Sequence, residues 1–388
     1  MSKFSDIPEW LKERKDAGLY RQRRVVGSAQ GRELVVDGHK LLNFCSNDYL
    51  GLANDPRVLK AFQQAAEIWG VGSGASHLVS GHTKAHAELE EALAEFTGRP
   101  RCLLFSSGYA ANMGTIQGLL GSTDHVFEDR LNHASLLDGG RISGARLKRY
   151  THRDTNDLDK KLSKVSDSDA RKLVITDGTF SMDGTICDVR AIAELTRKHD
   201  AWMMLDEAHS LGVTGTQGRG LADSEKYSVD DIQILIGTLG KAFGTQGGFV
   251  AGSNDLIETL IQQARTYIYS TALPSATAMA TLTSLRIARD EEWRRDRLHE
   301  LVQKFRIGAM QLGLELLDSE TPIQPIVLGD AQTAVKLSNA LEDMGILITA
   351  IRPPTVPANT SRLRVTFTAE HTDDDLNRLL SALEQTAA

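Results

Sequence analysis

Two polar stretches, each next to an apolar run, contain residue types that act on aldehydes and ring nitrogens. In "MMLDEAHSLG", Asp206 and His209 follow the apolar residues 203–205, which end a strand pattern. A carboxylate at the carboxyl end of a strand can hold a protonated ring nitrogen, and a nearby histidine can donate to a phenolate-type oxygen. In "GTLGKAFGTQGG", Lys241 lies among glycines, where a partly desolvated lysine can form a Schiff base with an aldehyde. Read singly, a helix-capping aspartate and a surface lysine explain the same letters.

Two further stretches could bind the rest of such a ligand. "LLFSSGYAANMG" runs from an apolar strand through Gly108 and Tyr109 into a helix pattern, and the N–H groups at a helix N-terminus suit a phosphate. The alternative is plain helix capping by Ser106 or Ser107. His133, in "NHAS", has a flat ring that could stack on another ring, although a lone histidine is more often structural.

The letters "DEAH" also spell a helicase box, and the rest of the chain argues against that function. An ATPase of this kind needs the phosphate loop G-x-x-x-x-G-K-[ST]. Here Gly240 and Lys241 are followed by Ala242, and the residue five places before Gly240 is Leu235. The net charge of −7 and the pI of about 5.9 also disfavour a nucleic-acid partner.

Length and cysteine usage indicate an ordinary intracellular protein. The chain has 388 residues, enough for one large domain and a smaller one. Its three cysteines, Cys45, Cys102 and Cys187, are far apart, so a disulfide framework is not expected. The N-terminus has no signal-peptide pattern and no run reaches ~20 apolar residues, which favours a cytoplasmic protein without a membrane span. His82 and His86 lie at i, i+4, but without an H-E-x-x-H pattern we expect a helix face and no metal.

Strand and helix patterns alternate along the first three quarters of the chain. The strand candidates are "RCLLFSS", "KLVITDG", "WMMLDE", "IQILIGT" and "GGFVAGS". Amphipathic helix patterns between them include "KAHAELEEALAEFTG", "ANMGTIQGLLG" and "DVRAIAELTRKHD". This alternation predicts an α/β fold with a mixed, mostly parallel sheet and helices on both faces.

The pattern changes after about residue 285. "RDEEWRRDRLHELVQKFRIGAMQLG" reads as one long charged helix, and "IQPIVLG", "GILITAI" and "RLRVTFTA" read as strands, with a helix pattern after the first and another at the C-terminus. We therefore predict an N-terminal segment over 1–45, a large domain over 46–285 and a small α+β domain over 286–388.

A phosphate anchor, a stacking ring, an acid for a pyridinium nitrogen and a Schiff-base lysine are together what pyridoxal 5'-phosphate requires. Their order along the chain resembles that of the aspartate-aminotransferase-like enzymes of fold type I. Within that fold, the chain resembles the α-oxoamine synthase family over nearly its whole length. The motifs that carry the resemblance are "NFCSNDYLGL", "NHASLLDG", "TFSMDG", "DEAHSLGVTGTQGRG", "GTLGKAFG", "YSTALP" and "AIRPPTVP".

The resemblance implies a role for each site residue. It implies catalysis by Lys241, His133, Asp206 and His209. It implies cofactor contacts by Gly108, Tyr109, His133, Ser181, Asp206, His209, Thr238, Lys241, Ser270 and Thr271. It implies substrate contacts by Arg21, Asn47, His133, Arg352 and Thr355.

Several of these roles are specific. Lys241 would carry the cofactor and move the Cα proton, and Arg352 would bind the amino-acid carboxylate. Ser270 and Thr271 would reach the cofactor phosphate of a partner subunit, because sites of this family lie at a homodimer interface. Asp177 stands where many members have a glutamate, which puts any role for that carboxylate in doubt.

The activity that the resemblance implies is condensation of an amino acid with an acyl thioester, with loss of CO₂. "NHASLLDG" and "AIRPPTVP" point to the branch that joins L-alanine to a pimeloyl thioester, on coenzyme A or an acyl-carrier protein, in biotin synthesis. The alternatives within the family are 5-aminolevulinate synthase, glycine C-acetyltransferase and serine palmitoyltransferase activities. A non-catalytic binding protein on this fold is a further alternative, and loss of the lysine or the aspartate would be its sign.

Overall fold

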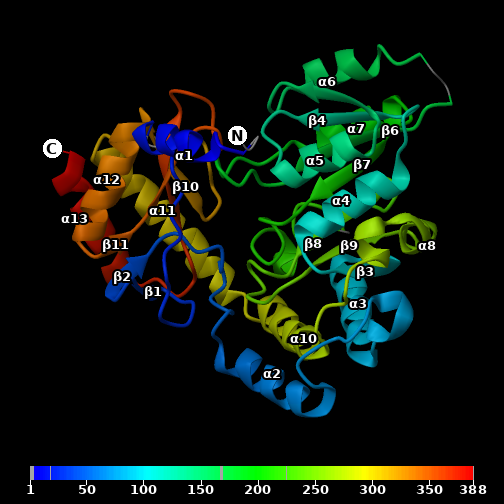
Figure 1. Cartoon of the computed structure of the whole chain (residues 1–388), viewed down its shortest axis with the longest axis horizontal. Helices are drawn as coiled ribbons and strands as arrows, with labels where there is room; N and C mark the ends of the chain where they lie inside the picture. Colours follow the sequence, from blue (N-terminus) through cyan, green and yellow to red (C-terminus); the bar gives the residue numbers. More distant parts are fainter. Residues whose placement is uncertain (1–3, 18, 167–168, 224, 388) are drawn as a thin grey trace. The chain divides into compact units, whose positions relative to one another are not determined.

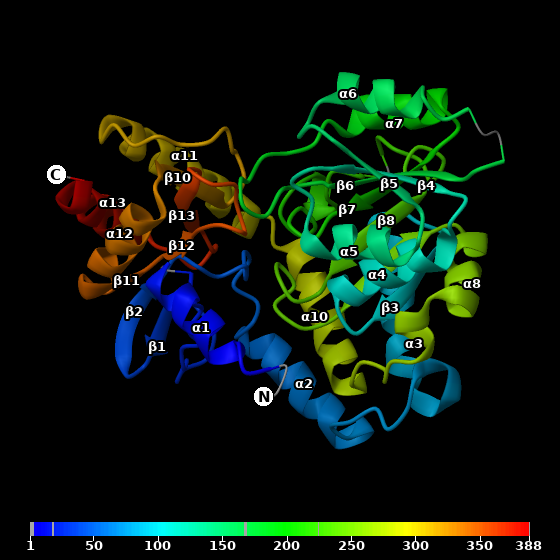
Figure 2. The ribbon, with the colours of Figure 1, turned by 45° about the horizontal axis from the view of Figure 1, so that its top comes forward.

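The structure is a computed structural model that describes residues 4–17, 19–166, 169–223 and 225–387 (Figures 1 and 2). Contacts divide the chain into two compact units. Unit 1 comprises the described residues of Met1–Asn47, Met182–Thr185 and Arg297–Ala388, and unit 2 comprises those of Asp48–Ser181 and Ile186–Asp296.

Unit 2 is built around a seven-stranded sheet of order β3-β9-β8-β7-β6-β4-β5. Its strands are β3 (Arg101–Phe105), β4 (His125–Asp129), β5 (Arg146–Tyr150), β6 (Lys172–Asp177), β7 (Trp202–Asp206), β8 (Ile234–Thr238) and β9 (Gly248–Gly252). β9 pairs antiparallel with both β8 and β3, and the pairs among β8, β7, β6, β4 and β5 are parallel. The predicted mixed, mostly parallel sheet is therefore confirmed.

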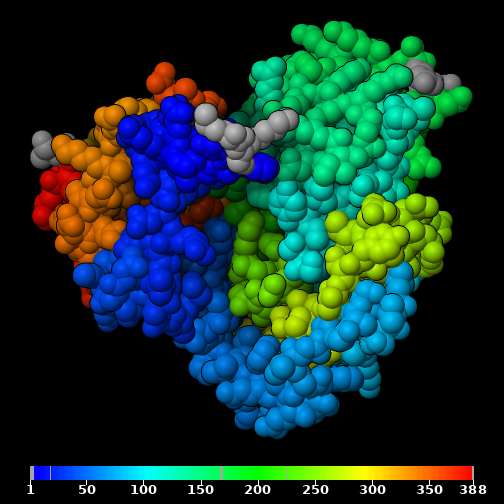
Figure 3. All heavy atoms as spheres, in the orientation of Figure 1, coloured from blue at the N-terminus to red at the C-terminus, as the bar shows by residue number. Residues whose placement is uncertain are grey.

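Helices cover both faces of this sheet, because its central strands are buried on both sides. The helices of unit 2 are α2 (Pro56–Trp69), α3 (Lys84–Thr97), α4 (Gly108–Leu119), α5 (Ala134–Ile142), α6 (Thr155–Leu162), α7 (Val189–Lys198), α8 (Asn254–Gln263), α9 (Arg265–Ile268) and α10 (Ser275–Asp290), with a π-helix, η1 (His77–Gly81), and a 3₁₀ turn, η2 (Thr216–Gly218). Of these, α2 packs mainly on α10. One apolar core joins α4, α5 and α8 to one face of the sheet. The side chains of these helices fill much of the visible face of unit 2 in Figure 3.

Five of the seven strands coincide with the strand candidates, namely β3, β6, β7, β8 and β9. β4 and β5 were not predicted. β4 reads "HVFED", so ionisable residues stand at both of its ends, although all five residues are buried. β5 reads "RLKRY" and lies at the edge of the sheet, where charged side chains reach water.

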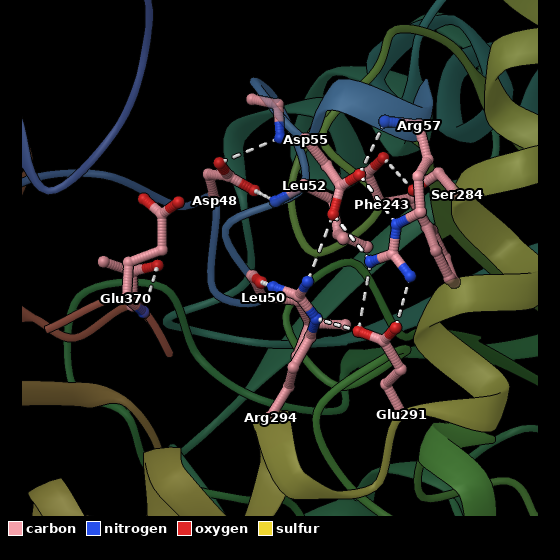
Figure 4. Close-up of polar contacts among 12 residues, drawn as sticks. Asp48, Leu50, Leu52, Asp55, Arg57, Phe243, Ser284, Glu291, Arg294 and Glu370 are labelled. Carbon is pink, nitrogen blue, oxygen red and sulfur yellow. Dashed lines mark hydrogen bonds and ion pairs between the residues drawn. The ribbon is translucent and has the colours of Figure 1, made fainter. Parts of the chain in front are cut away.

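The segment 48–57 braces the loop that carries Lys241 (Figure 4). Asp48 accepts hydrogen bonds from the N–H groups of Leu52 and Ala53, and Arg294 donates to the Leu50 carbonyl and pairs with Asp55. Ser284 of α10 donates to the Phe243 carbonyl at 2.5 Å. Gly244 (φ +62°) packs against the same segment, because a Cβ there would lie 2.3 Å from the Ala53 nitrogen.

Unit 1 combines two small sheets with four helices. The strands are β1 (Glu33–Val36), β2 (His39–Asn43), β10 (Ile323–Gly329), β11 (Ile346–Leu347), β12 (Thr349–Ile351) and β13 (Ser361–Thr366), in the orders β1-β2-β11 and β10-β13-β12. The helices are α1 (Ile7–Asp16), α11 (Trp293–Gln311), α12 (Ala331–Asp343) and α13 (Asp373–Ala387). Contacts place the boundary between the units inside α11, after Asp296.

Two predictions for the C-terminal region were wrong in detail. The charged segment 289–313 is not one helix, because α10 ends at Asp290 and α11 begins at Trp293. "GILITAI" is not one strand: β11 pairs with β2, whereas β12 pairs with β13 in the other sheet. Among the described residues, no helix is long and apolar enough to cross a membrane.

Candidate active site

A cavity of about 160 Å³ lies at the carboxyl edge of the unit 2 sheet, where ligands of open α/β folds bind. It is lined by Gly108, Tyr109, Asn112, His133, Ser135, Asp177, Ser181, Asp206, Ala208, His209, Thr238 and Lys241. Three of these residues are the last residues of strands, namely Asp177 (β6), Asp206 (β7) and Thr238 (β8). The parallel sheet thus gathers at one edge residues that are more than 60 positions apart in the sequence.

Lys241 and His209 are joined in a chain of hydrogen bonds that also includes Tyr49. The Lys241 Nζ atom donates to His209 Nε2 at 2.8 Å, and His209 Nδ1 lies 2.6 Å from the Tyr49 hydroxyl. Because Nε2 accepts, the neutral imidazole holds its proton on Nδ1 and donates it to Tyr49. Tyr49 is fully buried, so this phenol fixes the plane of the histidine ring.

Asp206 is held from two sides. Its Oδ1 atom accepts from the Ala208 N–H at 2.9 Å, and its Oδ2 atom accepts from Asn112 Nδ2 at 2.7 Å. The side chain is 5% exposed. A nearly buried carboxylate at a strand end, facing a cavity and held by neutral donors, can bind a cationic ring nitrogen without an internal cation competing for it.

His133 caps the N-terminus of α5. Its Nδ1 atom accepts from the Ser135 N–H at 3.3 Å and lies 2.7 Å from the Ser135 hydroxyl. Burial lowers the pKa of His133, and Lys241 lowers it further, whereas Asp206 opposes the shift. The ring is therefore neutral at pH 7, and the edge of Tyr109 faces it at 6.3 Å between centroids.

The N-terminus of α4 forms the other end of the cavity. Ser107 caps the helix by accepting from the Ala110 N–H, and Gly108 is the first helical residue. Gly108 lies against Thr238, and a Cβ on Gly248 would lie 2.5 Å from the Gly108 nitrogen, so only glycine lets β9 approach this closely. The first N–H groups of a helix lack intrahelical acceptors, and this end of the cavity suits an anion.

Two carboxyl groups beside Asp206 are shifted toward their neutral form. Burial, reinforced by Asp206, raises the pKa of Asp177 well above its usual range, and Asp177 accepts from the His133 N–H at 2.8 Å. Burial also raises the pKa of Glu207 to about 7. Glu207 accepts from the Ala222 N–H and does not line the cavity. The glutamate of "DEAH" therefore holds the loop that contains Ala222 and does not face the ligand.

Eight of the residues named from sequence line this cavity: Gly108, Tyr109, His133, Ser181, Asp206, His209, Thr238 and Lys241. Ser270 and Thr271 do not. They belong to the same unit, but follow α9 in a segment where Thr271 bridges to Ser76, and Thr271 is exposed.

Four of the five residues predicted to bind substrate lie in unit 1, namely Arg21, Asn47, Arg352 and Thr355, and the fifth, His133, lines the cavity in unit 2. Arg21 is exposed after α1, and Asn47 accepts from Arg364 at 3.1 Å. Arg352 and Thr355 follow β12, where the Thr355 N–H donates to the Arg352 carbonyl at 3.0 Å.

Sequence reasoning did not assign Asn112, Ser135 or Tyr49 to the site. Asn112 stands three residues after the motif "SSGY", Ser135 is the last residue of "NHAS", and Tyr49 stands inside "NFCSNDYLGL". For Asn112 the sequence signals only that a polar partner is needed, because an asparagine on a helix pattern that is otherwise apolar and small must be hydrogen-bonded when buried, and it does not identify that partner.

The side chains that line the cavity fit a flat ring that carries an aldehyde, a protonated nitrogen and an anionic group. Lys241 provides the amine, Asp206 the anion for the ring nitrogen and His209 a polar contact beside the amine. The start of α4 and Thr238 provide donors for the anionic group. These are the protein groups that pyridoxal phosphate requires.

Comparisons with known proteins agree with this assignment of the cofactor. A family model described as aminotransferase class I and II matches residues 39–383. Proteins named 8-amino-7-oxononanoate synthase are 57% identical in Pseudomonas putida (strain F1; 98% of this chain, 97% of that protein), 57% in Hahella chejuensis (99% and 97%) and 58% in Nitrosococcus oceani (97% and 99%).

Solved structures show the same fold. A serine palmitoyltransferase variant from S. paucimobilis, with a bound PLP–myriocin aldimine, superposes with a TM-score of 0.93 at 30% identity over 99% of this chain and 97% of that chain. An 8-amino-7-oxononanoate synthase from Francisella tularensis superposes with a TM-score of 0.78 at 31% identity over 89% and 98%. The fold is that of the type I pyridoxal-phosphate enzymes, and the chain belongs to the aminotransferase class I and II family, in the branch that contains these 8-amino-7-oxononanoate synthases.

Proposed function

We propose that this chain condenses L-alanine with a pimeloyl thioester, releasing CO₂ and a free thiol, to form 8-amino-7-oxononanoate in biotin synthesis. The observation that carries the proposal is the joint presence of Lys241, His209 and Asp206 in one cavity of a chain that is 57% identical to enzymes of that name. A non-catalytic protein on this fold would have no use for a lysine hydrogen-bonded to a cavity histidine.

Pyridoxal phosphate supplies an electron sink that stabilises negative charge at the alanine Cα. The residues of the chain do the rest. Lys241 Nζ would hold the cofactor and would accept and return the proton of the alanine Cα. Asp206 would keep the ring nitrogen protonated, since a neutral ring nitrogen is a poorer sink. His209, which contacts Lys241, would together with Ser181 contact the phenolic oxygen.

Other residues bind and orient. His133 would stack on the ring, and its neutral state would avoid a second cation beside a protonated pyridine. Gly108, Tyr109 and Thr238 would bind the phosphate. Arg352 binds the alanine carboxylate through a bidentate pair, and Arg21, Asn47 and Thr355 complete the substrate contacts.

The test compares several amino acids and several acyl thioesters as substrates. The visible absorption of the holoenzyme is followed during addition of alanine, glycine and serine, and thiol release is then measured with pimeloyl-, acetyl-, succinyl- and palmitoyl-coenzyme A. We expect a spectral response to alanine at the lowest concentration and thiol release with the pimeloyl thioester. A preference for glycine would move the assignment to a glycine-using sibling, and a preference for serine with palmitoyl-coenzyme A to serine palmitoyltransferase activity. Lys241→Ala is the control without covalent attachment.

We further propose a homodimer whose sites are shared, because Ser270 and Thr271 lie outside the cavity of their own chain. Complementation tests this. A mixture of Lys241→Ala and Thr271→Glu chains, unfolded and refolded together, contains one intact site per mixed dimer and regains activity. A mixture of Lys241→Ala and Asp206→Ala chains contains no intact site and stays inactive. Failure of the first mixture in the presence of mixed dimers contradicts the shared site.

The acyl donor and the compartment are also proposals. We propose that an acyl-carrier protein can deliver the pimeloyl group. The test is to compare kcat/KM for the pimeloyl thioester of an acyl-carrier protein with that for the pimeloyl thioester of coenzyme A. Cys45, Cys102 and Cys187 are free thiols, which supports a reducing, cytoplasmic location.

A further inference from the structure

Asn112 joins two residues of the cavity through one amide group. It is the fifth residue of α4, four positions after Gly108, and is 2% exposed. Its Nδ2 atom donates to Asp206 Oδ2 at 2.7 Å and to the Ser135 hydroxyl oxygen at 2.9 Å. Both protons of this amide nitrogen are therefore used inside the site.

The chemistry of the partners fixes the orientation of this amide. An ionised carboxylate only accepts hydrogen bonds, so the nitrogen of Asn112 must face Asp206. Within the described residues, Asn112 Oδ1 is buried without a hydrogen-bond partner. Leaving a buried carbonyl oxygen unpaired costs about 1–3 kcal/mol. The fold tolerates this cost at a residue whose two donors both serve cavity side chains.

The orientation of Asn112 determines the proton on Ser135 and, through it, the proton on His133. Because the Ser135 oxygen accepts from Asn112, its own proton is directed to His133 Nδ1, 2.7 Å away. The Ser135 N–H donates to the same nitrogen at 3.3 Å. His133 Nδ1 is thus an acceptor, and the neutral ring must carry its proton on Nε2.

We propose that Asn112 is a positioning residue that couples Asp206 to His133 through Ser135 and holds His133 as the neutral Nε2–H tautomer. The catalytic meaning of this coupling rests on the proposed function, in which Asp206 and His133 both face the pyridoxal ring. The tautomer makes Nε2–H the donor that His133 offers to a ligand in the cavity. It also ties the orientation of the Asp206 carboxylate to the orientation of the His133 ring.

Several charged or titratable groups face His133 and must be included in any test. They are Asp206 at the end of β7, Asp177 at the end of β6, Lys241 in the β8–β9 loop, Asp138 on α5 and Tyr109 on α4. Burial and Lys241 lower the pKa of His133, and Asp206 and Asp138 raise it. Donation by Ser135 to the unprotonated Nδ1 acts in the same direction as burial, because it stabilises the neutral ring.

The experiment uses the full chain labelled with ¹⁵N-histidine, without added cofactor, and reads the tautomer and the pH titration of His133 from its two ring-nitrogen shifts. The signal is assigned as the one lost in His133→Phe. Asn112→Leu removes both donors at nearly constant volume, and Ser135→Ala removes the hydroxyl alone. Thr115→Val is the matched control on α4, since Thr115 is fully buried, does not line the cavity, and its hydroxyl has no hydrogen-bond partner among the described residues.

We expect the wild type and Thr115→Val to show an unprotonated Nδ1 and a protonated Nε2. In Asn112→Leu and Ser135→Ala, His133 should titrate at a higher pH than in the wild type. An Nδ1–H tautomer in the wild type, or titration unchanged in both variants, overturns the proposal. If Asn112→Leu does not fold, Ser135→Ala alone decides.

A second measurement separates this proposal from the proposed function. The pH dependence of kcat with alanine and a pimeloyl thioester should shift in Asn112→Leu in the same direction as the His133 titration, while Thr115→Val keeps the wild-type profile. If the wild type forms no product from these substrates but the ring-nitrogen shifts respond as expected, the coupling stands and the proposed function falls. If product forms and the shifts do not respond, the coupling falls alone.

Discussion

Unit 2 contains two groups of histidines that differ in what surrounds them, and each group includes buried members: His209 in the first, and His77 and His86 in the second. His133 and His209 line the cavity, and the nitrogens of their rings contact side chains from several elements of the carboxyl edge. His77, His82 and His86 gather instead around the π-helix η1, where they contact mainly one another and the backbone. Both groups include histidines whose pKa is lowered by burial.

The η1 group holds a fold segment in place. His77 Nδ1 lies 3.0 Å from His82 Nδ1, and the His77 ring stacks on Tyr267 at 5.0 Å. The third histidine, His86, caps α3 because its Nδ1 atom accepts from the Thr83 N–H, and its Nε2 atom donates to the Leu273 carbonyl at 2.5 Å. These contacts fix the strand-like bridge between Ser76 and Thr271.

The comparison teaches that burial and a depressed pKa do not by themselves mark a functional histidine. The cavity histidines share a cavity with Lys241 and Asp206, whereas the η1 histidines do not line that cavity, and the carboxylate near them is Glu90, 4.0 Å from His82 Nε2. The sequence-based expectation that His82 and His86 share a helix face was wrong for His82, which precedes α3. Within the described residues, no group of three or more histidine, cysteine or carboxylate side chains is arranged to hold a metal.

The largest expected effect is that of Asp206→Ala. Loss of the carboxylate removes the partner of the ring nitrogen, and we expect kcat to fall by at least about 100-fold, or ~3 kcal/mol of activation free energy. Steady-state thiol release measures it, and circular dichroism verifies the fold. A loss below about tenfold would refute the role of Asp206.

Parallel replacement of His209 and His86 by alanine tests the comparison directly. His209→Ala should lower kcat by about 10- to 100-fold with little change in melting temperature, because it removes the partner of Lys241. His86→Ala should lower the melting temperature and leave kcat of the folded protein near the wild-type value, because it removes a buried helix cap. The reverse pattern would place the functional histidines in the η1 group.

A smaller effect is expected for Tyr49→Phe. The ring remains and the contact of the hydroxyl with His209 Nδ1 is lost, which is equivalent to about 1 kcal/mol or about fivefold in kcat. Unchanged kinetics at all pH values would show that the Tyr49 hydroxyl does not orient His209. Tyr150→Phe, a fully buried tyrosine outside the cavity, is the matched control.

The smallest effect concerns the pH dependence of stability. Burial lowers the pKa of His77 to about 3, so the unfolded chain binds the proton more readily than the folded one below the ordinary value of 6.5. The contribution of neutral, buried His77 to the free energy of unfolding is fully present above pH 6.5 and is lost progressively as the pH falls from 6.5 toward 3. The melting temperature of His77→Gln should therefore depend less steeply on pH between 7 and 5 than that of the wild type.

The control for that measurement is His299→Gln, because His299 is exposed on α11. The same slope in His77→Gln and in the wild type would mean that His77 does not contribute to the acid sensitivity of the fold.

Much of the fold could be predicted because hydrophobic patterns report burial. β6 and β7 are apolar on both faces and end in aspartates, so strand, direction and edge could be read together. β4 and β5 could not be predicted, because neighbouring strands in the sheet, and not the hydrophobicity of their own residues, decide whether they are buried or exposed. "GILITAI" gave one pattern for two strands, since its division at Ile348 is decided by pairing with distant strands.

The site divides in the same way. Lys241, Asp206 and His133 stand in motifs with unusual neighbours, and their common cavity follows from the strand order. Their roles remain predictions. Asn112 and Tyr49 could not be placed, because nothing local distinguishes a buried amide or phenol that touches a functional residue from one that touches backbone. Only tertiary geometry gives the distances of 2.7 and 2.6 Å to Asp206 and His209.

The antiparallel direction of β9 restricts how many residues the loop before it can contain. Since β8 and β9 are neighbours that run in opposite directions, nine residues, 239–247, suffice to connect them, and both ends of that connection are fixed by sheet pairing at Thr238 and Gly248. Inserting or deleting a single codon there would shift the lysine along the loop or the register of a central strand. Natural length variation is therefore expected in connections such as 120–124, which lead into the amino end of β4 and so lie away from the carboxyl edge, whereas the loop 239–247 should keep a constant length.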